Sequence, residues 1–360
     1  AVFSTDGTRI LTASADKTAK VWDANTGAEV LTLKGHTEGV RRASFSTDGT
    51  RVVTGSGKYG KPGEAMIWDA KTGAVLHTLN GHTATVYAAS FSGDGTRILT
   101  GDSDGVAKVW DAKSGVERLT LKGFKSGLSA ASFSADGTRI VTASWTDETA
   151  KVWDAKTGVE ILTLRGHTEG VRAASFSVDG TRILTASGGF LKRGEAKVWD
   201  ARTGDALLTL KGHTEGVNIA LFSADGTRIV TGSDDRTAKV WDARHVAEVR
   251  TLKGHTERTF AAAFSANGAR VVTGSFDCMA KVWDAKAGVE LLTLKGHTSE
   301  VRAASFSPDG TRIVTGSGSW DKTAKVWDAK TGAEVLTLKK GYKSGVTAAS
   351  FSPDGKRIVT

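Results

Sequence analysis

The pair Trp-Asp recurs along the whole chain at a nearly constant interval. It occurs eight times in 360 residues, and successive copies lie 42 to 46 residues apart. The copies are Trp22-Asp23, Trp68-Asp69, Trp110-Asp111, Trp153-Asp154, Trp199-Asp200, Trp241-Asp242, Trp283-Asp284 and Trp327-Asp328. A repeat of this length indicates one supersecondary unit that buries its apolar faces only against neighbouring copies. The chain is therefore predicted to fold as an array of similar units.

Each interval contains four short β-rich segments, which we name strands a to d. Within residues 132–167, strand a ends with SFS, and RIVTAS (139–144), AKVWD (150–154) and EILTL (160–164) are strands b, c and d. Asp-Gly and other polar turns separate them, and no segment shows a helical period. Because one such sheet cannot bury both faces alone, we expect an all-β fold of stacked four-stranded antiparallel sheets.

The order Gly-His, a later Asp and then Trp-Asp resembles the WD40-repeat β-propeller family. The resemblance covers the whole chain and implies a single propeller domain, residues 1–360, with eight four-stranded blades; nine blades is the alternative. The near-identity of the copies is similar to recently amplified arrays of bacterial type, and a consensus-designed array is the other source that fits.

The two ends of the chain overlap in content. Phe-Ser followed by an Asp-Gly or Asn-Gly turn occurs nine times, once more than Trp-Asp. We therefore expect blade 1, residues 1–34, to be closed by residues 343–360, which would protect exposed strand edges. The further blades are expected at about 35–80, 81–122, 123–165, 166–211, 212–253, 254–295 and 296–342.

Six histidines stand in Gly-His pairs, a pattern that invites metal or acid–base chemistry. In the WD40 family this histidine instead bonds an Asp in the b–c loop and helps to fix the Trp and a strand-b Ser. The resemblance implies this structural network for His213, Ser233, Asp235 and Trp241, and for His255, Ser275, Asp277 and Trp283. Phe124 and Tyr342 replace the histidine in two units, and the second and fifth units have no Asp in the b–c loop.

Variation between copies concentrates in the b–c loops, which carry large aromatic side chains. Loops on a rigid scaffold are common recognition sites. In an up-and-down sheet the b–c and d–a connections emerge on the same face, which we therefore expect to bind a partner. The aromatic residues in question are Tyr59, Trp145, Phe190 and Trp320.

One position near the start of strand a varies in the same way and is expected to surround the channel mouth. It reads Arg41, Tyr87, Ser129, Arg172, Asn218, Phe260, Arg302 and Thr347. Of these, Arg41, Tyr87, Arg172, Asn218, Phe260 and Arg302 are the candidate partner-binding residues. The arginines favour an acidic or phosphorylated protein or peptide segment. Local pairing with Glu38 and Glu169 is the alternative.

These patterns favour a non-catalytic protein-interaction scaffold or sensor in signalling. The net charge of +9 is spread over the units, which disfavours the alternative of a nucleic-acid-binding propeller. An enzyme propeller is disfavoured because the strand-a position holds no Asp, Glu, His or Cys, so we expect no catalytic residue, cofactor or metal. The single cysteine, Cys278, fits the cytoplasm or another reducing compartment. We expect no membrane partner and a monomeric propeller, alone or within a larger polypeptide.

Overall fold

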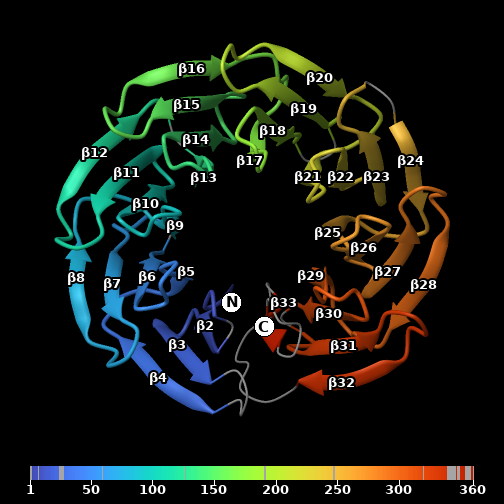
Figure 1. The fold of residues 1–360 in the computed structure, drawn as a ribbon, viewed down its shortest axis with the longest axis horizontal. Helices are drawn as coiled ribbons and strands as arrows, with labels where there is room; N and C mark the ends of the chain where they lie inside the picture. Colours follow the sequence, from blue (N-terminus) through green and yellow to red (C-terminus); the bar gives the residue numbers. More distant parts are fainter. Residues whose placement is uncertain are drawn as a thin grey trace. The chain divides into compact units, whose positions relative to one another are not determined.

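The computed structural model describes the chain except for residues 1, 7, 24–27, 59, 126, 190–191, 246–247, 319, 339–345, 347–348, 353–357 and 360. The described residues contain strands and turns and no helix, and the strands form eight four-stranded antiparallel sheets (Figure 1). This confirms the all-β propeller with eight four-stranded antiparallel blades. Two compact units divide the chain, Ala1–Ile183 with Ala201–Asp205, and Leu184–Asp200 with Ala206–Thr360.

Each sheet takes its four strands in sequence order. The first four sheets are β1 (Val2–Phe3), β2 (Arg9–Ala13), β3 (Thr18–Asp23), β4 (Glu29–Lys34); β5 (Val40–Phe45), β6 (Arg51–Ser56), β7 (Ala65–Asp69), β8 (Val75–Leu79); β9 (Val86–Phe91), β10 (Arg97–Asp102), β11 (Val106–Asp111), β12 (Glu117–Lys122); and β13 (Leu128–Phe133), β14 (Arg139–Ser144), β15 (Ala150–Asp154), β16 (Glu160–Leu164). The fifth sheet is β17 (Val171–Phe176), β18 (Arg182–Ser187), β19 (Glu195–Asp200) and β20 (Ala206–Leu210).

The remaining strands continue the same pattern. They are β21 (Val217–Phe222), β22 (Arg228–Ser233), β23 (Thr237–Asp242), β24 (Glu248–Lys253); β25 (Thr259–Phe264), β26 (Arg270–Ser275), β27 (Met279–Asp284), β28 (Glu290–Lys295); and β29 (Val301–Phe306), β30 (Arg312–Ser317), β31 (Ala324–Asp328), β32 (Glu334–Leu338). A final pair, β33 (Ser350–Phe351) and β34 (Ile358–Val359), forms a two-stranded sheet.

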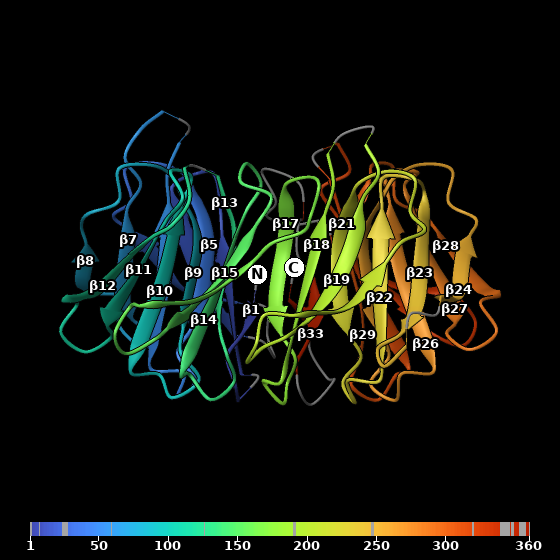
Figure 2. The ribbon, with the colours of Figure 1, turned by 90° about the horizontal axis from the view of Figure 1, so that it is seen from above.

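The strand boundaries follow the local sequence closely. The segments predicted at 139–144, 150–154 and 160–164 are β14, β15 and β16. Neighbours pair antiparallel, as β22 and β23 do side by side in Figure 2, with Ile229 opposite Trp241. In the Asp-Gly turns that the structure describes, the glycine has a positive φ, such as 65° at Gly226, which lets strands a and b join tightly.

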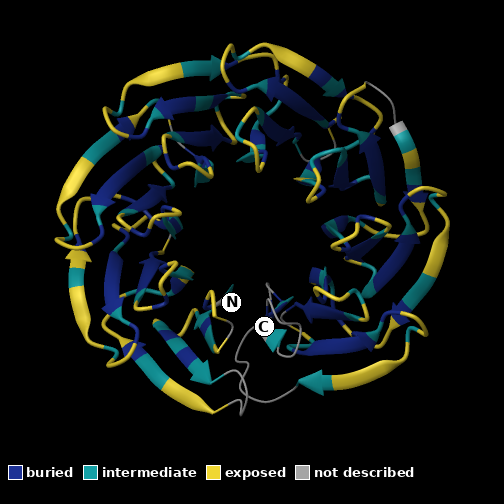
Figure 3. Cartoon of the chain, viewed as in Figure 1, coloured by how far each residue is buried: buried dark blue, intermediate teal, exposed yellow. Residues whose placement is uncertain are grey.

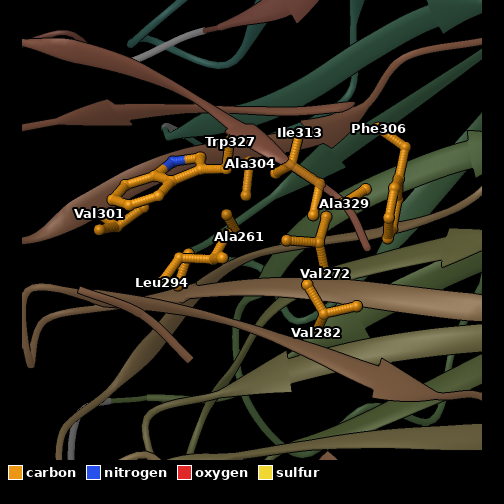
Figure 4. Packing of buried hydrophobic residues seen from close by; sticks show 11 residues of the cluster. Ala261, Val272, Val282, Leu294, Val301, Ala304, Phe306, Ile313, Trp327 and Ala329 are labelled. Carbon is orange, nitrogen blue, oxygen red and sulfur yellow. The ribbon is translucent and has the colours of Figure 1, made fainter. Parts of the chain in front are cut away.

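Burial rises and falls across each sheet in the way that stacked sheets require. Strand b is almost wholly buried, as in β26, whereas strand d, as in β28, is mostly exposed or partly exposed (Figure 3). The buried residues of adjacent sheets form shared cores. In one such core Trp327 of β31 packs with Leu294 of β28 and Val282 of β27 (Figure 4). The recurring tryptophan is therefore a packing residue between sheets, and truncating one buried aromatic typically costs about 3–5 kcal/mol.

In five copies of the repeat, the arginine after the Asp-Gly or Asn-Gly turn joins its sheet to the next one. Arg97 Nη1 donates to Ala155 O at 3.1 Å, and Nη2 donates to Gly137 O at 2.7 Å. Its guanidinium carbon also lies 5.1 Å from the Phe133 ring centroid. The same pair of hydrogen bonds to backbone carbonyls is made by Arg9, Arg51, Arg139 and Arg270. These arginine charges therefore make contacts between sheets of the array.

The C-terminal hairpin packs on the sheet β29–β32. Ser350 pairs with Val359, and Phe351 shares a buried cluster with Val314 and Val326. The Arg312 guanidinium carbon lies 5.3 Å from the Phe351 ring centroid, as in the contacts between full sheets. β33 and β34 thus dock as the first two strands of a further sheet would. Closure of blade 1 by residues 343–360 stays a prediction.

Candidate functional site

The Gly-His histidine is the centre of a buried hydrogen-bonded chain in the sheet β25–β28. His255 Nδ1 lies 2.7 Å from Asp277 Oδ2, and His255 Nε2 lies 2.8 Å from Thr273 Oγ1. Trp283 Nε1 donates to the same Thr273 oxygen at 2.8 Å. Ser275 lies beside this chain, and its hydroxyl donates to the Glu257 carbonyl at 2.9 Å. The hydroxyl between histidine and tryptophan therefore belongs to the threonine.

The sheet β21–β24 repeats this arrangement. His213 Nδ1 lies 2.8 Å from Asp235 Oδ2, His213 Nε2 lies 2.8 Å from Thr231 Oγ1, and Trp241 Nε1 donates to Thr231 at 2.9 Å. Ser233 bonds the Gly216 carbonyl at 2.9 Å. The threonine is the residue that the sequence reasoning missed, although a Thr two positions before the strand-b Ser in nearly every copy was a visible signal.

The chemistry of the groups at the two ends fixes the direction of two hydrogen bonds in this buried chain. A tryptophan N–H can only donate, and an ionised carboxylate can only accept. Thr273 therefore accepts from Trp283, and His255 Nδ1–H donates to Asp277. Burial raises the pKa of Asp277, but hydrogen bonds from His255 and two backbone N–H groups outweigh it and lower that pKa. The connectivity resembles Asp–His–hydroxyl catalysis, but Thr273 is fully buried and offers no oxygen to a substrate.

Other sheets contain the same buried hydrogen-bonded chain, but its acidic residue comes from a different position. In the second unit, which has no Asp in its b–c loop, His36 Nδ1 lies 3.3 Å from Glu64 Oε2 and Nε2 lies 2.6 Å from Thr54. In the third, buried Asp102 at the end of β10 lies 2.6 Å from His82 Nδ1. Burial lowers the pKa of His36 despite the nearby glutamate. A carboxylate at either position therefore satisfies the histidine.

In the first compact unit the candidate partner-binding residues have separate surroundings. Arg41 is exposed and its Nε donates to Gly57 O at 3.3 Å, while Glu38 pairs with Lys61 at 2.8 Å. Tyr87 and Trp145 stack edge-on with ring centroids 6.2 Å apart, and Trp145 is 50% exposed. The structure thus brings one strand-a residue and one loop aromatic together. Arg172 is half-buried, and Tyr59 and Phe190 lie outside the described residues.

In the second compact unit the side chains of Phe260, Phe276 and Arg302 form a tighter group. The Phe260 and Phe276 ring centroids lie 6.1 Å apart, and the Arg302 guanidinium carbon lies 5.6 Å from the Phe260 ring. Arg302 Nε also donates to Glu300 at 2.9 Å, so local pairing and aromatic stacking coexist. Phe276, which the sequence reasoning missed, is 48% exposed and directly follows the strand-b Ser, as Trp145 does.

Two further candidates stand apart from this group in their contacts. Asn218 donates to Asp234 Oδ1 at 2.8 Å and to Thr259 O at 3.3 Å, so its amide is already engaged within the array. Trp320 in the b–c loop of β30 and β31 is 90% exposed.

No three His, Cys, Asp or Glu side chains among the described residues are grouped as metal ligands would be. Within the same residues no helix is long and apolar enough to cross a membrane.

This architecture is similar to that of known proteins. The family model for the WD domain, G-beta repeat (WD40), matches residues 1–23, 27–69, 73–111, 115–154, 158–200, 204–242, 247–284, 288–328 and 332–360. The crystal structure of the computationally designed Ika8 protein is similar, with 32% identity, a TM-score of 0.73, and coverage of 91% of this chain and 96% of that chain. A search of curated proteins found no match. The bacterial type of the array stays a prediction.

Proposed function

Because the chain belongs to the WD40 family, whose propellers are commonly non-catalytic protein-interaction scaffolds, we propose that it binds a protein or peptide segment through its b–c and d–a loops. The observation that carries this proposal is the group of Phe260, Phe276 and Arg302 in the second compact unit. Two aromatic rings and a guanidinium meet there at a surface, and such residues dominate binding hot spots.

The chemistry of this group favours an acidic or phosphorylated segment. Arg302 stacks on Phe260, which orients its planar fork, and within the described part of the chain its guanidinium bonds Glu300 through Nε alone. The remaining guanidinium N–H groups suit a carboxylate or phosphate of a partner. Phe276 supplies the apolar contact that excludes water around such a pair. The partner is therefore expected to carry an apolar residue close to an anionic one.

The test compares two truncations in one sheet. F276A removes an aromatic ring from the b–c loop, and V289A removes an exposed side chain from the c–d turn at the other end of the same sheet. Both proteins and the wild type are measured against an array of acidic and phosphorylated peptides. Since a hot-spot aromatic contributes above ~1 kcal/mol, F276A should weaken binding about fivefold or more, and V289A should not. Equal binding by all three proteins would contradict the proposal.

A further inference from the structure

One unit departs from the others at the position of the Gly-His histidine. Where other units read Gly-His-Thr-Glu or a close variant, this one reads Gly-Phe-Lys-Ser at residues 123–126, and the same kind of substitution recurs as Gly-Tyr-Lys-Ser at residues 341–344. The change removes a carboxylate and adds a lysine. It also replaces the histidine that elsewhere bonds the b–c loop acid, so the local chemistry of this unit must differ.

The structure shows how the acid is held without the histidine. Asp147 Oδ2 accepts from the Lys125 backbone N–H at 2.9 Å and from Ser144 Oγ at 3.2 Å. In the sheet β25–β28 the corresponding Asp277 accepts from both Thr256 N–H and His255. Phe124 cannot make the second bond, and it packs its ring against the sheet core instead. The b–c loop that carries Asp147 is therefore still held by hydrogen bonds, although the histidine that bonds the acid in other units is replaced by Phe124.

An open surface cavity of about 540 Å³ lies at this place, and its volume falls within the range of ligand sites. It is lined by Lys122, Gly123, Phe124, Lys125, Asp147, Thr149, Lys151, Thr163 and Arg165, all in the first compact unit. Gly123 matters for its shape, because a Cβ atom there would lie 2.7 Å from the Trp153 ring and 2.8 Å from Lys151 Cδ. The d–a loop can therefore approach the sheet only with glycine at that position.

The charge of the lining is positive. Four cations, Lys122, Lys125, Lys151 and Arg165, line the cavity with one carboxylate, Asp147. Lys151 is already paired with Glu160 at 2.7 Å, so two carboxylates offset four cations. Among the described residues, no hydrogen bond or salt bridge involves the side chains of Lys122, Lys125 or Arg165. Burial raises the pKa of Glu160, but Lys151 and the charge of Arg165 help to lower it.

We propose that this cavity binds a phosphate monoester carried by a phosphorylated protein segment. A monoester bears close to two negative charges at neutral pH, which matches the excess of two cations. The Phe124 ring lies on the wall and can contact the carbon chain that bears the phosphate, with Lys151 Nζ 5.9 Å from its centroid. Asp147 and Glu160 interrupt the basic surface, so a continuous nucleic-acid backbone is a poorer match than one anionic group.

The experiment uses the full chain and two variants with opposite expectations. K125S removes a cavity cation, and K156S removes an exposed lysine from the c–d turn at the other end of the same sheet. Fluorescence anisotropy is measured with peptides that carry tyrosine, phosphotyrosine or phosphoserine, with inorganic phosphate as a competitor. Because a charge-assisted bond is lost, K125S should weaken phosphopeptide binding about tenfold, whereas K156S should leave it unchanged.

A second variant guards against misfolding. F124H/K125T restores the Gly-His-Thr of the other units, so it should fold and yet lose the phosphopeptide. No preference for phosphorylated over plain peptide, or equal loss in K156S, would overturn the proposal. If inorganic phosphate competes at the same concentration as the phosphopeptide, the cavity binds free phosphate, and the proposal of a phosphorylated protein segment is wrong. Tighter binding of a single-stranded oligonucleotide with a steep salt dependence would assign the cavity to nucleic acid instead.

This inference depends on a different surface from the Phe276 site. Binding of unphosphorylated acidic peptides should therefore depend on Phe276 and not on Lys125, whereas the preference for phosphorylated over plain peptide should depend on Lys125 and not on Phe276. A protein that loses one activity and keeps the other distinguishes the two proposals.

Discussion

The threonine at the centre of the buried chain gives the sharpest test of how a blade is held together. Thr273 joins His255 and Trp283, and no part of its side chain reaches solvent. Thr273→Val keeps the shape of the side chain and removes only the hydroxyl. The histidine Nε2 and the tryptophan N–H then lose their common partner at once.

The size of the effect follows from the two groups left behind. Each buried polar group without a hydrogen bond costs about 1–3 kcal/mol, so Thr273→Val should lower the free energy of unfolding by about 2–6 kcal/mol. Thr273→Ser is the matched control, because it keeps the hydroxyl and loses one methyl group, worth about 1 kcal/mol. The valine variant should therefore be clearly less stable than the serine variant, although valine is the more apolar residue.

The assay is urea unfolding followed by tryptophan fluorescence, together with hydrogen exchange of the Trp283 indole N–H. In Thr273→Val that N–H should exchange faster, because its acceptor is gone, while in Thr273→Ser it should stay protected. If valine proves as stable as threonine, or more stable than serine, the hydroxyl has no structural role and the account of the chain given above is wrong.

Two further predictions concern acid stability and the C-terminal hairpin. The pKa of Asp225 is lowered from 3.8 to about 2, first because the Ser223 hydroxyl bonds it and then because Thr227 N–H does. The folded protein thus binds this proton less readily than the unfolded chain, so its contribution to stability is complete above pH 3.8 and is lost as the pH falls through 2; S223A should raise the pKa toward 3.8 in a carboxyl NMR titration, and an unchanged value would contradict the assignment. Deletion of residues 343–360 removes Phe351 from its cluster with Val314, so we expect a lower melting temperature and self-association through uncovered strands, and a monomer of unchanged stability would count against both the docking role and the proposed closure of blade 1.

The sequence alone was sufficient for the strands and the fold class. Asp-Gly turns, apolar strand-b segments and the recurring Trp-Asp are local signals, and they repeat often enough that one ambiguous copy is corrected by the others. The segments expected at 139–144, 150–154 and 160–164 agree with β14, β15 and β16 for this reason. The number of blades also followed from counting copies of strands c and d.

The contacts between sheets required the tertiary structure. Nothing near Arg97 in the sequence shows that its guanidinium reaches Gly137 and Ala155, because those acceptors are backbone carbonyls of the next sheet. Thr273 and Ser275 lie two positions apart on the same face of β26, so the sequence pattern does not show which of the two hydroxyls meets His255. The basic cavity depends on the absence of a histidine in one loop and on lysines from several strands. Sequence periodicity specifies which residues repeat, whereas only the packing of one sheet against another decides which of those repeated side chains come within bonding distance.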